Sequence, residues 1–316
     1  MTRKICAALL AVLLCSGCAF GAQGVIGWAA GGGTDTLMRI LTSQMNGTVD
    51  PVTRTGLAGA MATMYVYGQP ADGQTLLMNA ENPTLYKLLG YSDIDYDDFE
   101  CVLLAATEVV GVIVPADSKW QTFTEIVEAA KSGQEVVEAT TNVGGMPWTL
   151  TAMLGNVTGA SFIQEWYAGD MAARDAVVNG KADFTFCKLQ MGKDLFRDGK
   201  LKFISLIHNE KIDGWDVPLI TDEYPAFAEN LPWGPFYGVF VKKGTAPDVL
   251  AKWRGEFLKA YNSEAFQKYL ADTRMTPLGL SGEEAVKFIH DWQARTLAVL
   301  SKANLNMNFR FNVGEC

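Results

Sequence analysis

The sequence predicts an α/β protein of two lobes, and three observations support that prediction. Segments that resemble buried strands alternate with segments of helical apolar spacing along most of the chain. At 316 residues, the chain is longer than one typical domain. The strand–helix rhythm also restarts after residue 117, as it would at the start of a second unit.

The first lobe is expected to begin with a strand at "GVIGWA" (24–29), followed by a helix over Thr34–Gln44. Further strands are expected at "VDPVTRT" and "GQTLLMNA", with one or two in "FECVLLAATEVVGVIVPA", and helices at "AGAMATMYVYG" and "PTLYKLLG". This order of elements predicts a sheet with helices packed against it.

The second lobe repeats the alternation. Its expected strands are "EVVEATT", "ASFIQEW", "ADFTFCKL" and "KFISLIH", and its helices are "FTEIVEAA", "PWTLTAMLGNV" and "DMAARDAVVNG". A strand at "FYGVFVKKGT" then returns to the first lobe. Three helices with caps at Asp248, Ser263 and Ser281 are expected to complete the chain, packed on the first sheet.

The chain is therefore expected to cross between the lobes twice, near Pro115 and near Pro235. Residues 23–116 and 236–316 are assigned to lobe 1, and residues 117–235 to lobe 2. Two crossings would act as a hinge, with a cleft between the lobes.

Residues 1–22 have the pattern of an export signal, in which Arg3 and Lys4 precede an apolar run too short to span a bilayer. Two alternatives remain open. Cleavage after Ala19 or Gly21 would leave a free periplasmic protein. Alternatively, "CSGC" resembles a lipobox, and Cys18 would then carry the lipid anchor.

The formal charge of −9 becomes −9 − 2 = −11 once Arg3 and Lys4 are removed with the leader. Such a charge argues against nucleic acid as a partner, because that binding needs a basic surface. The acidic stretch "SDIDYDDFE" lacks the spacing of a calcium loop, and we expect a solvated surface loop there.

Outside the leader, the cysteines are Cys101, Cys187 and Cys316. Their spacing fits no metal site, and neither a metal nor a cofactor is expected. They are either isolated apolar side chains or, for Cys101 and Cys316, a disulfide in an oxidising compartment.

A glycine-rich turn, Gly31-Gly32-Gly33, joins the first strand to its helix. Without Cβ atoms, such a turn lets backbone N–H groups approach a ligand closely. The helix that begins at Thr34 or Asp35 adds unpaired donors and a partial positive charge, which together suit a carboxylate or phosphate. The alternative is a plain turn that Asp35 caps.

The second lobe carries a similar turn in "TTNVGGMPW", where Thr141 and Asn142 precede two glycines and Pro147 lies in the first turn of a helix. One such turn is a weak signal, but one in each lobe indicates a ligand held between them. Catalysis has little support, because His208 and His290 are the sole histidines and no nucleophile motif occurs. We therefore expect a binding protein, not an enzyme.

Several segments resemble the motifs of a known family, in matching order and spacing. They are "GWAAGGGTD", "TRTGLAGA", "DGQTLL", "NVGGMPWT", "WYAG", "DVPLITDEY" and "GTAPDVL". Over nearly its whole mature length, the chain is similar to the Bug-type extracytoplasmic solute receptors of tripartite tricarboxylate transporters. The resemblance implies a type II periplasmic binding protein fold, a Venus flytrap that closes on small carboxylates and serves a membrane permease. A monomer is expected.

The resemblance and the two turns together assign a set of ligand-binding residues. They are Trp28, Ala30, Gly31, Gly32, Gly33, Thr34, Asp35, Thr141, Asn142, Gly144, Gly145, Trp148, Tyr167 and Asp170.

The chain departs from the family pattern at four positions. Gly27 and Trp28 replace a usual Pro-Phe, Trp148 stands where His is frequent, and Trp166 replaces a Pro before Tyr167. Because an indole adds apolar surface and removes an acceptor, we expect a carboxylate with an apolar or aromatic body, not citrate. The alternative is that some of these tryptophans only pack the lobes. Two other functions remain open, a receptor for a signalling partner and an exported enzyme with Asp35 as base.

Overall fold

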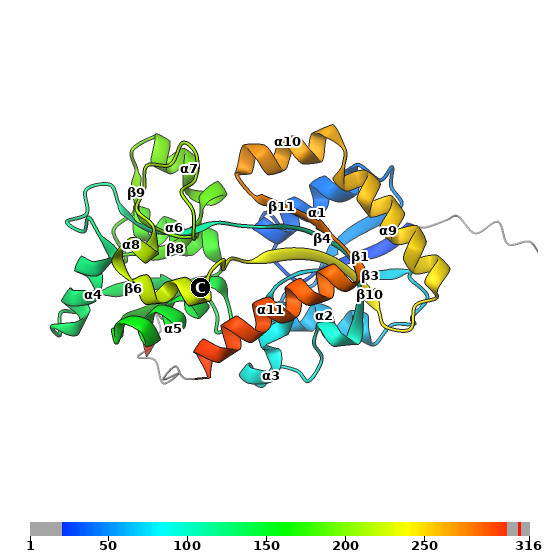
Figure 1. Ribbon diagram of the computed structural model, residues 1–316, viewed down its shortest axis with the longest axis horizontal. Helices are drawn as coiled ribbons and strands as arrows, with labels where there is room; N and C mark the ends of the chain where they lie inside the picture. Colours follow the sequence, from blue (N-terminus) through cyan, green and yellow to red (C-terminus); the bar gives the residue numbers. More distant parts are fainter. Residues whose placement is uncertain (1–20, 302–308, 311–316) are drawn as a thin grey trace, which may run out of the picture.

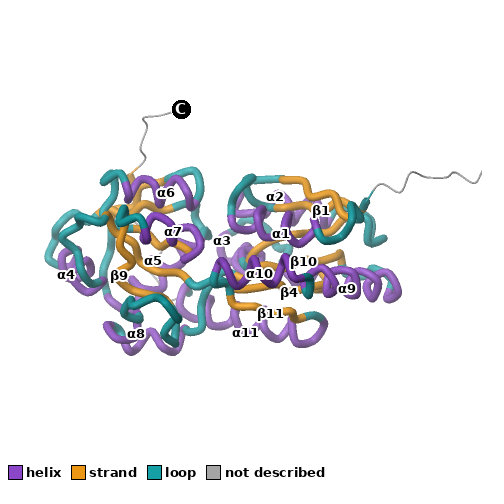
Figure 2. Tube along the Cα trace, turned by 90° about the horizontal axis from the view of Figure 1, so that it is seen from above, coloured by secondary structure: helices purple, strands orange, loops and turns teal. Residues whose placement is uncertain are grey.

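The computed structural model describes residues 21–301 and 309–310, and it has two lobes joined by a narrow waist (Figures 1 and 2). Lobe 1 lies on the right of Figure 1 and contains both the beginning of the described chain and most of its C-terminal part. Lobe 2, on the left, is formed chiefly by the middle of the chain. The prediction of a two-lobe α/β fold is confirmed.

Lobe 1 contains a six-stranded sheet in the order β11-β4-β10-β3-β1-β2. Its strands are β1 (Ala22–Ile26), β2 (Val49–Thr53), β3 (Thr75–Ala80), β4 (Phe99–Thr107), β10 (Phe236–Lys242) and β11 (Thr276–Leu280). Strands β2, β1 and β3 are parallel, whereas β10 runs antiparallel to both β3 and β4.

Helices cover both faces of this sheet. They are α1 (Gly33–Ser43), α2 (Ala60–Tyr67), α3 (Tyr86–Leu89), α9 (Pro247–Tyr261), α10 (Glu264–Thr273) and α11 (Gly282–Leu300), with 3₁₀ turns η1 (Leu57–Gly59), η2 (Asn82–Leu85) and η3 (Tyr96–Asp98). In α1, the spacing of Leu37, Met38 and Leu41 places all three on one face, where each is fully buried. Packing of this face fixes the start of α1 beyond the carboxyl end of β1.

Lobe 2 contains two three-stranded sheets, β8-β5-β9 and β12-β7-β6. The strands are β5 (Val110–Pro115), β6 (Val137–Thr140), β7 (Ile163–Trp166), β8 (Thr185–Lys188), β9 (Leu201–Ile207) and β12 (Phe309–Arg310). The helices are α4 (Phe123–Lys131), α5 (Met146–Thr158), α6 (Asp170–Val178), α7 (Leu189–Arg197), α8 (Ile220–Glu223) and the 3₁₀ helix η4 (Pro225–Asn230). A parallel bridge between Glu138 and Phe184 joins the two sheets.

The first crossing lies earlier than Pro115, the position expected from the sequence. Strand β5 pairs with β8 and β9 of lobe 2, so the chain leaves lobe 1 between Thr107 and Val110. The assignment of residues 110–116 to lobe 1 is therefore wrong. The reason is that β4 and β5 form one almost continuous apolar run, in which the crossing leaves no turn signal.

The C-terminal region also departs from the sequence prediction. Strand β11 was not expected, and it pairs antiparallel with β4 at the edge of the lobe 1 sheet. Strand β12 pairs with β7, so residues 309–310 belong to the lobe 2 sheet and not to lobe 1. Helix α11 runs towards lobe 2 and ends beside α5 (Figure 1). The C-terminal region thus contributes a strand to a sheet of each lobe.

The helix caps follow the predictions in part. Ser263 caps α10 by accepting a hydrogen bond from the backbone N–H of Phe266. Ser281 occupies the cap position of α11 without a side-chain bond. The prediction for Asp248 is wrong, because Ala246 is the cap and Asp248 lies in the first turn of α9.

The two crossing segments lie side by side at the hinge. Pro235 O accepts hydrogen bonds from the Glu108 backbone N–H and from Thr107 Oγ1, both at 3.0 Å. A Cβ on Gly234 would lie 2.0 Å from Glu108 O, so only glycine permits this approach. The hinge therefore consists of two crossing segments whose backbones lie in direct contact.

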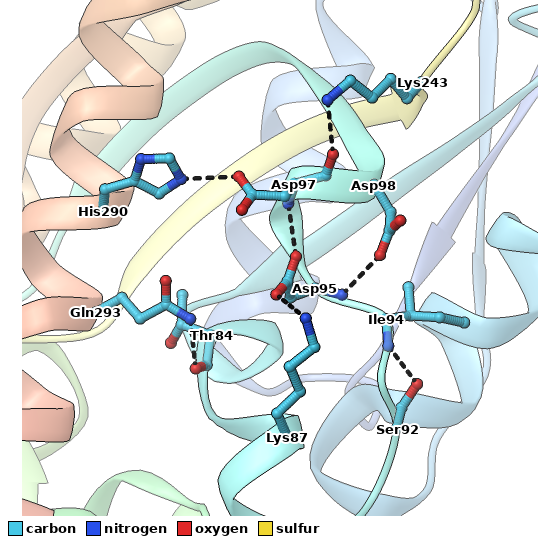
Figure 3. Close-up of polar contacts among 10 residues, drawn as sticks. All are labelled: Thr84, Lys87, Ser92, Ile94, Asp95, Asp97, Asp98, Lys243, His290 and Gln293. Carbon is cyan, nitrogen blue, oxygen red and sulfur yellow. Dashed lines mark hydrogen bonds and ion pairs between the residues drawn. The ribbon is translucent and has the colours of Figure 1, made fainter.

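The acidic stretch around residue 95 is more tightly held than a solvated loop (Figure 3). Asp95 is buried and caps η3, and Lys87 Nζ lies 3.0 Å from its Oδ2. His290 of α11 contacts Asp97 Oδ1 at 2.8 Å. The expectation of a solvated loop is therefore wrong for Asp95. Asp97 is exposed, and its side chain contacts α11 through His290.

Two sequence predictions lie wholly or partly outside the described residues. One is the leader 1–22 with Cys18, of which only residues 21 and 22 are described, and the other is the Cys101–Cys316 bridge, because Cys316 is not described. Cys101 is buried in the core, as is Cys187. The assignment of Ala22 to the leader conflicts with its place as the first residue of β1.

Glu138 on β6 is fully buried in lobe 2, where Gln164 Nε2 donates to its Oε2 at 2.9 Å. Burial raises the pKa of Glu138 from 4.5 to about 8, although hydrogen bonds with Thr151 and Gln164 partly lower it. The folded protein thus holds a proton there that the unfolded chain releases between about pH 4.5 and 8. The contribution of Glu138 to the free energy of unfolding is complete below pH 4.5 and is lost as the pH rises to 8.

Glu138→Gln should therefore stabilise the protein in alkaline solution, because glutamine keeps the hydrogen bonds without the buried charge. Each pKa unit corresponds to about 1.4 kcal/mol, so the gain at pH 8.5 is expected to be about 5 kcal/mol, and close to zero at pH 4.5. Urea unfolding of both proteins across this range measures it. A gain that stays constant with pH would show that Glu138 does not hold that proton.

Candidate ligand-binding site

A cavity of about 150 Å³ lies between the two lobes. Eight residues that the sequence analysis assigned to ligand binding line it, namely Trp28, Ala30, Gly32, Gly33, Thr34, Thr141, Asn142 and Asp170. The lining also includes Ala29, Ala80, Glu81, Asn82, Met146, Ala168, Gly169, Met171, Lys188, Met191 and Pro235. Both glycine turns thus reach the same space.

The first turn is held by its own residues. Gly31 has a φ of +79°, and its N–H donates to Asp35 Oδ2 at 3.0 Å. Arg39 Nε donates to the other oxygen of Asp35 at 2.8 Å. Gly31 and Asp35 do not line the cavity, and they act by shaping the turn.

The N-terminus of α1 faces the cavity through Gly33 and Thr34. The Gly32 N–H donates to Ala29 O at 3.1 Å. Helix geometry leaves the next N–H groups, those of Gly33, Thr34 and Asp35, without helical acceptors. These donors and the helix dipole favour an anion at this point.

The second turn brings the N-terminus of α5 to the opposite side. Thr141, Asn142 and Met146 line the cavity, and the N–H of Gly145, the cap residue of α5, donates to Asn142 O at 2.8 Å. Gly144 lies outside the lining, and its carbonyl accepts a hydrogen bond from Asn82 Nδ2 at 2.6 Å. Gly144 and Gly145 thus shape the turn and link it to lobe 1.

A third helix N-terminus, that of α6, also reaches the cavity. Gly169 is its cap residue, and Gly169, Asp170 and Met171 line the space. Three helices of nine or more residues therefore direct their positive ends at one cavity.

Lys188, the last residue of β8, is the cation of the cavity and was missed by the sequence analysis. Its Nζ lies 3.0 Å from Asp170 Oδ2 and 3.7 Å from Glu108 Oε2. Burial disfavours its charged form, but Tyr237, Asp170 and Glu108 outweigh burial and hold the pKa of Lys188 well above its ordinary value. Lys188 is therefore charged at neutral pH.

Glu108 lies in the first crossing and joins both lobes. Its Oε1 accepts from Gln190 Nε2 of α7 at 2.5 Å, and its Oε2 accepts from the Tyr237 hydroxyl of β10. Burial raises the pKa of Glu108, although Lys188, Tyr237 and Gln190 act in the opposite direction. A Cβ on Gly33 would lie 3.3 Å from Lys188 Nζ. The ion pair of Glu108 and Lys188 therefore lies next to the first glycine turn.

Besides Gly31, Asp35, Gly144 and Gly145, two further predicted ligand residues, Trp148 and Tyr167, lie outside the lining. Trp148 is 2 % exposed and belongs to the apolar core, so it packs the lobe. Tyr167 packs beside the lobe 2 core and its hydroxyl donates to Glu165 Oε2 at 3.1 Å. Trp28 does line the cavity, and its indole N–H donates to Asn79 Oδ1 at 3.0 Å.

The residues that the sequence analysis missed share one signal. Glu81 directly follows β3, and Lys188 ends β8. In open α/β sheets, ligands bind beyond the carboxyl ends of the strands, so the polar residues at those ends were candidates.

Within the described ranges, no group of three or more His, Cys, Asp or Glu side chains could hold a metal ion, and no helix is long and apolar enough to cross a bilayer.

Two lobes with a ligand-sized cavity between them, lined by residues of both, define a binding protein of the Venus-flytrap class. The chain belongs to the tripartite tricarboxylate transporter family of receptors, whose model matches residues 32–305. It is 22% identical to the protein BugT of Bordetella pertussis over 296 residues, which is 90% of each chain.

Solved structures share the fold. MatC from Rhodopseudomonas palustris, solved with bound malate, superimposes with a TM-score of 0.78 at 20% identity, covering 89% of this chain and 98% of that one. Rpa4515 of R. palustris, solved with adipate, gives a TM-score of 0.79 at 18% identity, with 89% and 96% covered.

Proposed function

We propose that the chain is an extracytoplasmic solute-binding protein that closes on a small organic carboxylate and delivers it to the permease of a tripartite tricarboxylate-type transporter. The observation that carries this proposal is the convergence of three helix N-termini and Lys188 on one cavity between the lobes. Backbone donors and a buried cation replace the hydration that a carboxylate loses on entry. The malate and adipate in MatC and Rpa4515 support the same class of ligand.

Contacts between the lobes favour a closed form around the ligand. Asn82 of lobe 1 bonds to Gly144 of lobe 2, and the Tyr91 hydroxyl donates to Val143 O at 3.0 Å. On another side, Lys193 Nζ donates to Asp272 O at 2.8 Å. Ligand binding would add to these contacts and shift the population towards closure.

The rest of the cavity favours an apolar ligand body of limited size. Trp28, Met146, Met171 and Met191 supply apolar and polarisable surface. A cavity of ~150 Å³ in another protein holds one benzene molecule, so we infer a ligand of roughly six to ten non-hydrogen atoms. Citrate is larger than that range, so we expect it to fit poorly.

Calorimetric titration with a panel of carboxylates tests the proposal. We expect binding of mono- or dicarboxylates with an apolar body at pH 7, and much weaker binding of citrate. A carboxylate with a pKa of ~4 should lose affinity as the pH falls from 7 to 3, because its protonated form no longer matches the helix N-termini. Unchanged affinity at pH 3, in protein shown to be folded, would contradict the proposal.

A further inference from the structure

Two buried oxygens on residues that line the cavity have no hydrogen-bond donor among the described residues. They are Glu81 Oε2 and Asn82 Oδ1, on consecutive residues between β3 and η2. Both residues line the cavity, and their side chains are buried, with 3% and 1% of each residue exposed. Buried acceptors are rarely left without donors, so these oxygens indicate a missing partner.

The orientation of Asn82 follows from its neighbour. Its Nδ2 lies 2.6 Å from Gly144 O, and a carbonyl can only accept, so the amide nitrogen must face Gly144. Oδ1 therefore faces away from that contact and remains free to accept. Flipping the amide would set two acceptors against each other.

The cation of the cavity does not supply the missing donor. Lys188 is 3.0 Å from Asp170 and 3.7 Å from Glu108, and no ion pair joins it to Glu81 within the described ranges. Burial raises the pKa of Glu81 to about 7, while its own backbone N–H and Lys188 lower it and Asp170 and Glu108 raise it. Near neutral pH, a cationic group brought to Glu81 would stabilise the ionised form.

The charges that line the cavity also limit the ligand. They are Glu81, Asp170 and Lys188, which sum to −1 with Glu81 ionised and to zero with Glu81 protonated. A dicarboxylate would add two negative charges to a space whose one lining cation already has two carboxylate neighbours. A zwitterion would add no net charge.

We propose that the solute is an amino acid, with its carboxylate at the helix N-termini and its ammonium group at Glu81 Oε2 and Asn82 Oδ1. The proposal rests on the carboxylate-binding function above and narrows its ligand class. An ammonium group has three N–H donors, enough to satisfy both oxygens at once. Glu81 and Asn82 would then determine specificity for the amine.

Matched pairs of acids test this, each with the same carbon skeleton with and without the amine. The probes are leucine against 4-methylpentanoate and 5-aminopentanoate against pentanoate, titrated into wild-type protein, Glu81→Gln and a control variant, Glu264→Gln, on the surface of α10. In at least one pair, wild-type protein and the control should bind the amino acid at least ~10-fold more tightly than the deaminated acid. Glu81→Gln should reduce that preference below ~3-fold, with the affinity for the deaminated acid nearly unchanged.

The results separate failure of the two proposals. Deaminated acids that bind as tightly as the amino acids would overturn the ammonium site and leave carboxylate binding intact. A preference that survives in Glu81→Gln would also overturn it. If neither these acids nor the dicarboxylates bind, the carboxylate-binding function itself fails. Circular dichroism of each variant verifies the fold.

Discussion

Gly32→Val should lower the affinity for the carboxylate ligand by at least ~100-fold, which is the loss expected from one or two charge-assisted hydrogen bonds. Gly32 lines the cavity immediately before the N–H groups at the start of α1. A valine side chain there would occupy the space through which a carboxylate reaches Gly33 and Thr34.

The fold should survive this substitution. Gly32 has φ −70° and ψ 168°, a conformation that valine adopts readily. The nearest atom to an added Cβ is Ala29 O at 3.1 Å, so a shift of a few tenths of an ångström is enough. Calorimetry gives the affinity, and thermal unfolding shows whether the fold is retained.

Gly255→Val is the matched control. Gly255 lies on α9, away from the cavity, and a Cβ there would have no atom within 4 Å. We expect this variant to bind as wild-type protein does. Wild-type affinity in Gly32→Val would show that the ligand does not approach the first glycine turn.

Lys188→Met should lower the free energy of unfolding by about 3 to 5 kcal/mol at pH 7, the range seen when one partner of a buried ion pair is removed. The substitution leaves Glu108 buried, its carboxyl side chain 2% exposed, without its cation. Asp170 loses its partner at the same time. Urea unfolding of ligand-free protein measures the effect, and Lys181→Met on the surface is the control.

A second variant identifies the cause of that loss. Lys188→Met combined with Glu108→Gln should recover part of the stability, because the unpaired buried charge is gone while Tyr237 and Gln190 keep hydrogen-bonding partners. The loss in Lys188→Met alone should also be smaller at pH 5, since burial raises the pKa of Glu108 and protonation removes the unpaired charge. A loss below 1 kcal/mol at pH 7 would show that the pair is not a structural link between the lobes.

The local elements of the fold could be predicted because their signals are local. The helix spacing that places Leu37, Met38 and Leu41 on one face fixes α1, and the glycines before it mark the turn. Strand β11 escaped prediction because "TPLGL" contains Pro277 and Gly279, residues that usually weaken a strand and are tolerated at an edge.

The lining of the candidate site follows from local sequence where it depends on the backbone, and not where it depends on pairing across the chain. Residues of both glycine turns line the cavity, whereas their role in ligand binding stays a prediction. Lys188 and Glu108 are 80 positions apart, and only the folded chain brings their charges together. Trp148 has the apolar spacing of a core helix, and nothing in the sequence shows that it faces the core and not the ligand.

A crystal structure of the protein with an acid that it binds in solution would show where the carboxylate lies. We expect the ligand between the lobes, with a carboxylate oxygen about 2.7 to 3.1 Å from N–H groups at the start of α1, directly or through one ordered water. A ligand bound elsewhere, or with its carboxylate turned away from all three helix N-termini, would contradict it.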